Sequence, residues 1–253
     1  MLPGLRAIKR FLIVFIALGI VLIAILYGGR LFQKPVISPT PDPLAGIQPI
    51  KILSTDLFRI ADRDYDVLFR VQNPNQTYGS GDVQYKLVSE GAEIYEGSFY
   101  ILPGQTKYMV ISPVKSERII EKVEMHIDSV DWRELDTLAL EGVSFVVTNT
   151  SYGKTSQEGL FARLRGFVAN NSDFDVNRAD VAIILFDEKD RPLAINRTEL
   201  YTFLAHTTRG FETSWFHTFP GEVARTYIEV NANLFEQASF IRTYGGQERF
   251  QTY

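Results

Sequence analysis

The chain has 253 residues, a formal net charge of −4 and no cysteine. The lack of cysteine excludes disulfides, thiolate metal sites, a cysteine nucleophile and a lipidated cysteine anchor. The mild acidity and the absence of a long basic run argue against nucleic acid as a partner, because such proteins carry a cluster of Lys and Arg. The length is enough for two domains of ordinary size.

The first predicted element is an uncharged, apolar stretch over residues 11–29. As a helix it would be roughly 28 Å long, close to the ~30 Å hydrocarbon core of a bilayer. We therefore expect a single transmembrane helix with the lipid bilayer as its partner. A cleaved signal peptide is the alternative, but its apolar region is usually only ~7–15 residues long and ends at a small-x-small cleavage site. This stretch ends instead in Leu26-Tyr27-Gly28-Gly29.

Basic residues indicate the orientation of this helix. Arg6, Lys9 and Arg10 precede it, whereas Arg30 and Lys34 follow it, and cytoplasmic flanks are enriched in Lys and Arg. We expect residues 1–10 to be cytoplasmic and the remainder to lie outside the plasma membrane. Residues 30–46 contain prolines at positions 35, 39, 41 and 43, which favour an extended backbone, so this segment is predicted to be a linker.

Beyond the linker the sequence contains a weak internal repeat. Residues 67–75 (VLFRVQNPN) resemble 164–172 (LRGFVANNS), and 82–88 resemble 180–186. The spacing of about 100 residues is the size of one immunoglobulin-type sandwich, and short β-like runs alternate with Gly, Pro and Asn turns.

The fold class predicted is all-β: one N-terminal transmembrane helix followed by two tandem immunoglobulin-like β-sandwich domains. The domains are expected at residues 47–136 and 137–242, with a C-terminal tail at 243–253. The sequence leaves open whether the two domains are docked together or hinged at Asp131–Leu140.

The second half resembles a known family. Gly166–Asn170 reads as a strand that ends in Asn, and Ile183–Asp187 corresponds to the strand that names the FxLYD domain. Leu185 matches the pattern, whereas Ile183 replaces the usual Phe and Phe186 the usual Tyr. The FxLYD domain is an exported β-sandwich related in shape to the late embryogenesis abundant group 2 domain.

The first half is a looser copy of this pattern, and the family's glycine after the naming strand is not evident at Asp190-Arg191. The resemblance implies a non-catalytic module of the cell envelope. It brings no catalytic residue to transfer.

Catalytic and metal-binding motifs are weak. The histidines His126, His206 and His217 are far apart and lack metal-ligand spacing, and no G-x-S-x-G or phosphate-binding glycine loop occurs. We expect no enzyme activity and no cofactor, although a triad built from distant residues stays open.

Asp62, Asp64 and Asp66 form a D-x-D-x-D pattern and are weak candidates for a Ca²⁺ site, because hard cations prefer carboxylate oxygens. An EF-hand loop would need Gly and Glu where Val67 and Asn73 stand. The alternative is a solvated edge strand, whose charges would prevent aggregation.

The aromatic residues Trp132, Trp215, Phe216 and Phe219 are expected to belong to the core. The alternative is a binding patch: if Tyr201, Phe203, Trp215 and His217 share one exposed face, they could bind a protein or a sugar.

The sequence thus predicts a membrane-anchored structural or interaction protein of the cell envelope, which presents two non-catalytic β-sandwich domains outside the membrane and binds another envelope protein. The alternative is an extracytoplasmic ligand-binding or sensing module for a glycan, a lipid or Ca²⁺. A homo-oligomer is left open.

Overall fold

The computed structural model describes residues 12, 14–23, 44–135 and 140–236. The chain divides into two compact units, Met1–Ala45 and Gly46–Tyr253. In the first unit residue 12 and residues 14–23 are helical, with exposed apolar side chains. Over the residues that are described, no helix is long and apolar enough to cross a membrane.

Several predicted segments lie partly or wholly outside the described residues. These are residues 1–10, much of the 11–29 span, most of the 30–46 linker and the 243–253 tail. The predicted boundary between residues 136 and 137 also falls there.

The first β-sandwich has two three-stranded antiparallel sheets, with strand orders β1-β2-β5 and β4-β3-β6. Its strands are β1 (Lys51–Arg59), β2 (Asp64–Gln72), β3 (Tyr78–Ser89), β4 (Ala92–Ile101), β5 (Thr106–Lys115) and β6 (Glu124–Glu134).

The second β-sandwich has the sheets β11-β8-β7 and β10-β9-β12, also antiparallel. Its strands are β7 (Phe145–Lys154), β8 (Ala162–Asn170), β9 (Val176–Phe186), β10 (Pro192–Phe203), β11 (Thr208–Trp215) and β12 (Arg225–Ala232). The two sandwiches have the same strand order: each strand of the first corresponds to the strand numbered six higher in the second. The all-β prediction is confirmed, and the sequence repeat corresponds to a repeated topology.

The burial of β2 shows why these segments form strands. Tyr65, Val67, Phe69 and Val71 alternate along β2 and belong to the core of the first sandwich. Alternate side chains of a strand point to opposite faces, so an apolar residue at every second position covers one face of the sheet. These four side chains therefore lie between the two sheets of the first sandwich.

Strand β9 is buried on both faces. Val181, Ile183 and Leu185 belong to the core of the second sandwich, whereas Ile184 and Phe186 belong to a separate apolar cluster. A continuous apolar run is typical of a strand that is covered on both sides.

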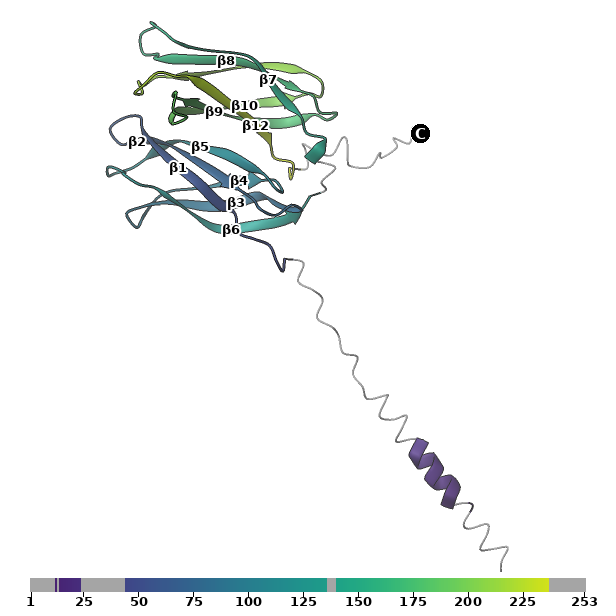
Figure 1. Ribbon diagram of the computed structural model, residues 1–253. Helices are drawn as coiled ribbons and strands as arrows, with labels where there is room; N and C mark the ends of the chain where they lie inside the picture. Colours follow the sequence, from purple (N-terminus) through teal and green to yellow (C-terminus); the bar gives the residue numbers. More distant parts are fainter. Residues whose placement is uncertain (1–11, 13, 24–43, 136–139, 237–253) are drawn as a thin grey trace, which may run out of the picture. The chain divides into compact units, whose positions relative to one another are not determined.

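The separate cluster joins the two sandwiches. It consists of Leu68 from β2, Val110 from β5, Ala182, Ile184 and Phe186 from β9, and Ile195 from β10. The sheet β1-β2-β5 thus packs its outer face against the outer face of β10-β9-β12. Figure 1 shows the resulting order of layers, with β7 and β8 on one outer side and β3, β4 and β6 on the other. The two sandwiches are docked face to face.

Candidate functional site

The main candidate site is a cavity of ≈ 360 Å³ between the two sandwiches. Strands β4 and β5 of the first sandwich and β9 and β10 of the second supply most of its wall. Because β4 and β5 belong to different sheets, the space between these two edges opens toward the second sandwich. Small-molecule sites typically have volumes of about 300–1,000 Å³, so the cavity is large enough for a small ligand.

Lys107 on β5 is the buried cation of this cavity. Its side chain is only 6% exposed, and its Nζ lies 3.6 Å from the centre of the Tyr100 ring and 5.8 Å from that of Phe99. Burial lowers the pKa of Lys107 to about 8, while the nearby Asp180 and Glu229 carboxylates oppose this shift. The amine therefore remains mainly protonated at neutral pH, in contact with an aromatic face.

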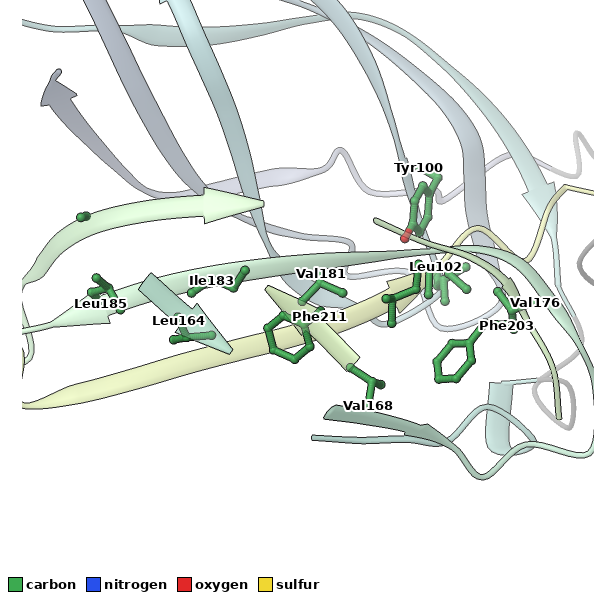
Figure 2. Packing of buried hydrophobic residues seen from close by; sticks show 14 of the residues in the cluster. Tyr100, Leu102, Leu164, Val168, Val176, Val181, Ile183, Leu185, Phe203 and Phe211 are labelled. Atoms are coloured by element: carbon green, nitrogen blue, oxygen red, sulfur yellow. The ribbon is translucent and has the colours of Figure 1, made fainter. Parts of the chain in front are cut away.

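Tyr100 on β4 brings an unpaired hydroxyl to the same cavity. Within the described part of the chain this buried hydroxyl has no hydrogen-bond partner. Burial raises the pKa of Tyr100 well above its usual value, and the Asp180 carboxylate raises it further as a nearby charge and acceptor, although the two groups do not reach hydrogen-bond geometry. Tyr100 and Leu102 come from the first sandwich but belong to the core cluster of the second, and Figure 2 shows both beside Val176 and Val181.

Glu229 of β12 lies behind Lys107 in a network of hydrogen bonds. It accepts bonds from the Tyr108 backbone N–H at 3.3 Å, from Asn231 Nδ2 at 2.6 Å and from the Tyr227 hydroxyl at 3.3 Å. Burial raises the pKa of Glu229, and these donors partly offset that rise.

The same network joins the sandwiches at further points. Gln105 Nε2 donates to Asn231 Oδ1 at 2.8 Å, and the rings of Tyr108 and Tyr227 meet edge to face at 5.5 Å. Polar contacts therefore fix one end of the interdomain face, beside the apolar cluster.

Two arginines also line the cavity. Arg178 is paired with Asp180 at 3.2 Å, whereas Arg197 is exposed and forms no salt bridge with a described residue. Lys107 likewise forms no salt bridge within the described ranges. Among the residues that the structure describes, the cavity thus offers two cations that form no salt bridge and, at Tyr100, a hydroxyl without a hydrogen-bond partner. Chemically, this arrangement can bind an anion.

The three aspartates of the predicted Ca²⁺ site do not come together. Asp62 lies in the turn before β2 and pairs with Arg59 at 3.0 Å, Asp64 begins β2, and Asp66 is buried at 3% exposure. In the described segments no three Asp, Glu or His residues are placed to hold a metal ion. The alternative of a solvated edge strand is wrong for Asp66, because β2 is the central strand of its sheet.

Asp66 has a different environment. Its Oδ1 accepts a very short hydrogen bond from Ser112 Oγ. Burial raises the pKa of Asp66, and the Ser112 bond and the nearby His217 lower it in part. The structure therefore brings together Asp66 and His217, one residue from each of the two predicted sites, and both line a second cavity at the domain interface.

The predicted aromatic patch is not one exposed face. Phe203 and Trp215 are 0% and 1% exposed and belong to the core of the second sandwich, where Trp215 Nε1 donates to the Ile195 carbonyl at 2.9 Å. Tyr201 is 58% exposed. The patch prediction is wrong because alternation along β10 and β11 points Phe203 and Trp215 between the two sheets.

Sequence reasoning missed Lys107 and Tyr100. Lys107 reads as an ordinary exposed lysine on a strand, and its counterpart in the second sandwich, Arg209, is indeed exposed. The two correspond because Lys107 pairs with Val71 and Arg209 with Val168. Only Lys107 is covered by the other sandwich, and no local signal carries that information.

Comparisons with known proteins give little for this chain. No family model matches its sequence, and no curated protein matches it. One similar solved structure is a crystal structure of the calcium-binding domain CBD12 of CALX1.1, with 16% identity, a TM-score of 0.22, and coverage of 70% of this chain and 78% of that one. A likeness this low carries no argument about the site.

Proposed function

We propose that this chain is a non-catalytic ligand-binding module of the cell envelope, in which two immunoglobulin-like sandwiches hold a small ligand between them. The observation that supports this most is the interdomain cavity with Lys107 and Tyr100 in its wall. Lys107 is buried without a salt bridge to a described residue, and the Tyr100 hydroxyl is buried without a hydrogen bond.

These groups argue against a purely structural contact. A buried, unpaired polar group costs about 1–3 kcal/mol, and a buried charge costs more. Apolar residues would make a more stable interface at these positions, as they do at Leu68, Val110 and Ile184. A bound ligand that pairs with both groups would offset the cost.

Anchoring in the membrane is part of the proposal and rests on the sequence. Residues 11–29 are uncharged and long enough to span a bilayer as a helix, with basic residues before them. Extraction of host membranes with alkaline carbonate tests this point. We expect the full-length chain in the membrane pellet, and a shortened soluble form would indicate a cleaved signal peptide instead.

Ligand binding can be tested with the full-length chain in detergent. The protein is dialysed against a small-molecule extract of its host, and compounds enriched with it are identified by mass spectrometry. The variant Ser98→Trp places a large side chain at the cavity wall on an exposed position of β4. Its matched control is Ser129→Trp on β6, also exposed but away from the cavity.

We expect one or a few compounds to be enriched by the wild type and by Ser129→Trp but not by Ser98→Trp. Equal enrichment by both variants, or no enriched compound at all, would contradict the proposal.

Binding of another envelope protein is a second candidate function, supported by the outer face of the sheet β11-β8-β7. On this face Phe167 is 46% exposed and Val146 41%, and Arg165 pairs with Glu212 at 2.5 Å beside them. Exposed apolar side chains with a charged rim are typical of contact surfaces, although this pair is small. Crosslinking in cells followed by mass spectrometry should then capture a partner through β7 and β8, and Phe167→Ser should reduce the yield.

A further inference from the structure

We infer that the ligand of the interdomain cavity is a small organic carboxylate, with its carboxylate group bound by the Lys107 ammonium and the Tyr100 hydroxyl and with Arg197 at the cavity wall. This inference rests on the proposed function and names the chemical class of its ligand.

The first argument is the set of free donors. The ammonium of Lys107 carries three N–H groups, and its side-chain contacts with described residues are cation–π contacts with Tyr100 and Phe99. Its contact with the Tyr100 ring is a cation–π contact at 3.6 Å, which uses the face of the ring and leaves the hydroxyl unoccupied. A carboxylate has two oxygens and can accept from the ammonium and the hydroxyl together. Charge-assisted hydrogen bonds of this kind are the stronger ones in proteins.

The second argument is the net charge that the site tolerates. Asp180 and Glu229 lie close enough to Lys107 to influence its titration. A single negative charge on the ligand is balanced by Lys107, but the second charge of a phosphate would be repelled by these carboxylates in a poorly solvated site. The site therefore favours a monoanionic group over a dianionic one.

The third argument is the rest of the wall. Tyr85, Tyr95 and Phe99 form a connected aromatic group, with ring centres 6.2 Å apart for Tyr85 and Tyr95 and 5.7 Å apart for Tyr85 and Phe99. Such a surface can contact the hydrocarbon part of a ligand. Glu199, also in the cavity wall, can accept a hydrogen bond from a hydroxyl group.

Protonation of Lys107 adds a testable feature. Because burial lowers the pKa of this amine to about 8, the ammonium needed for binding is present at pH 7 and mostly absent at pH 9.5. Affinity for a carboxylate should therefore fall by at least about 10-fold between these two values.

The inference can be tested by isothermal titration calorimetry on the full-length chain in detergent. The probes are the monocarboxylates lactate, butyrate and benzoate, with inorganic phosphate and glucose for comparison. The variants are Lys107→Met, Tyr100→Phe and Arg197→Gln. The matched control is Arg209→Gln, which changes the exposed counterpart of Lys107 in the second sandwich.

We expect at least one of the three carboxylates to bind. Lys107→Met and Tyr100→Phe should each weaken it about 10-fold or more, Arg197→Gln about 3-fold, and Arg209→Gln not at all. If Lys107→Met does not fold, Tyr100→Phe removes only a hydroxyl, and the pH comparison needs no variant.

The carboxylate inference is overturned if none of the three binds, or if Arg209→Gln weakens binding as much as Tyr100→Phe does. If phosphate or glucose binds instead and Ser98→Trp abolishes that binding, the carboxylate class is wrong and the proposed ligand-binding function stands. If no probe binds and no extracted compound is enriched, both proposals fall.

Discussion

Asn73 and Asn170 occupy the same position in the two sandwiches, at the ends of β2 and β8, and both side chains are fully buried. Each Nδ2 donates to backbone carbonyls of its own sandwich: Tyr78 and Leu102 for Asn73, at 2.7 and 3.0 Å, and Phe174 and Phe203 for Asn170, at 3.1 and 3.2 Å. Each Oδ1 accepts from the backbone N–H two residues further on, at 3.0 Å. One amide thus ties the end of a strand to two other segments, and the duplicated chain does so twice.

Replacing this amide by a carboxylate should unfold the sandwich that contains it. Asn170→Asp removes the donor and places a negative charge against buried carbonyls, so we expect a loss of about 3 kcal/mol or more in unfolding free energy. Urea denaturation followed by tryptophan fluorescence measures it, because Trp215 lies in the same sandwich. The neighbouring Asn171→Asp, at an exposed position, should cost less than about 0.5 kcal/mol. Equal losses for the two variants would show that the buried amide has no special role.

Lys107 should make stability depend on pH in the alkaline range. Its folded pKa of about 8 lies below the ordinary lysine pKa of 10.5, so the unfolded chain binds more protons between these values. The contribution of Lys107 to the free energy of unfolding is therefore lowest below pH 8. It increases by up to ~3 kcal/mol as the pH rises toward 10.5. The difference in unfolding free energy between the wild type and Lys107→Met, measured in urea from pH 7 to 10.5, should show this increase. A constant difference would mean that the amine is not buried as described.

The buried pair of Ser112 and Asp66 should make the free energy of unfolding depend on pH in the acidic range. The Ser112 hydroxyl donates to a buried carboxylate, so Ser112→Ala should cost about 1–3 kcal/mol at pH 7. Burial raises the pKa of Asp66 above the ordinary aspartate value of 3.8, so the folded chain binds more protons than the unfolded one as the pH falls toward that value. The stability contributed at Asp66 therefore rises as the pH falls toward that value, and Asp66→Asn should remove this rise. Ser129→Ala, exposed on β6, is the control and should leave the profile unchanged.

The interdomain cluster should make the two sandwiches unfold together. Ile183 and Ile184 are adjacent on β9 and both 0% exposed, but Ile183 faces the second core and Ile184 faces the first sandwich. Ile→Ala at either position should cost about 2–5 kcal/mol. We expect Ile183→Ala to keep one transition and Ile184→Ala to divide it into two. Separate probes of each half are available in single-tryptophan variants that retain Trp132 or Trp215. Two separate transitions already in the wild type would argue against cooperative docking.

Local sequence was sufficient for the strands and their duplication. Apolar residues at every second position of β2 specify a strand with one face in the core, and Asn with Gly or Pro between runs specifies its turns, because both signals act over only a few residues. The strand-ending asparagines were visible for the same reason, since a buried amide and its turn lie in one short segment. The continuous apolar run in β9 also carried a local signal that both faces of this strand are covered.

Tertiary structure alone decided the site. Alternation predicts that side chains point to two faces of a sheet, but it does not say which face packs against another sheet or domain. Phe203 and Trp215 lie in the core of the second sandwich, and Asp66 is covered at the interface between the sandwiches. Lys107 and Arg209 hold the same place in the repeat, and only docking of the second sandwich makes one buried and leaves the other in solvent. The lowered pKa of Lys107 follows from that docking, because desolvation depends on atoms that are distant in the chain.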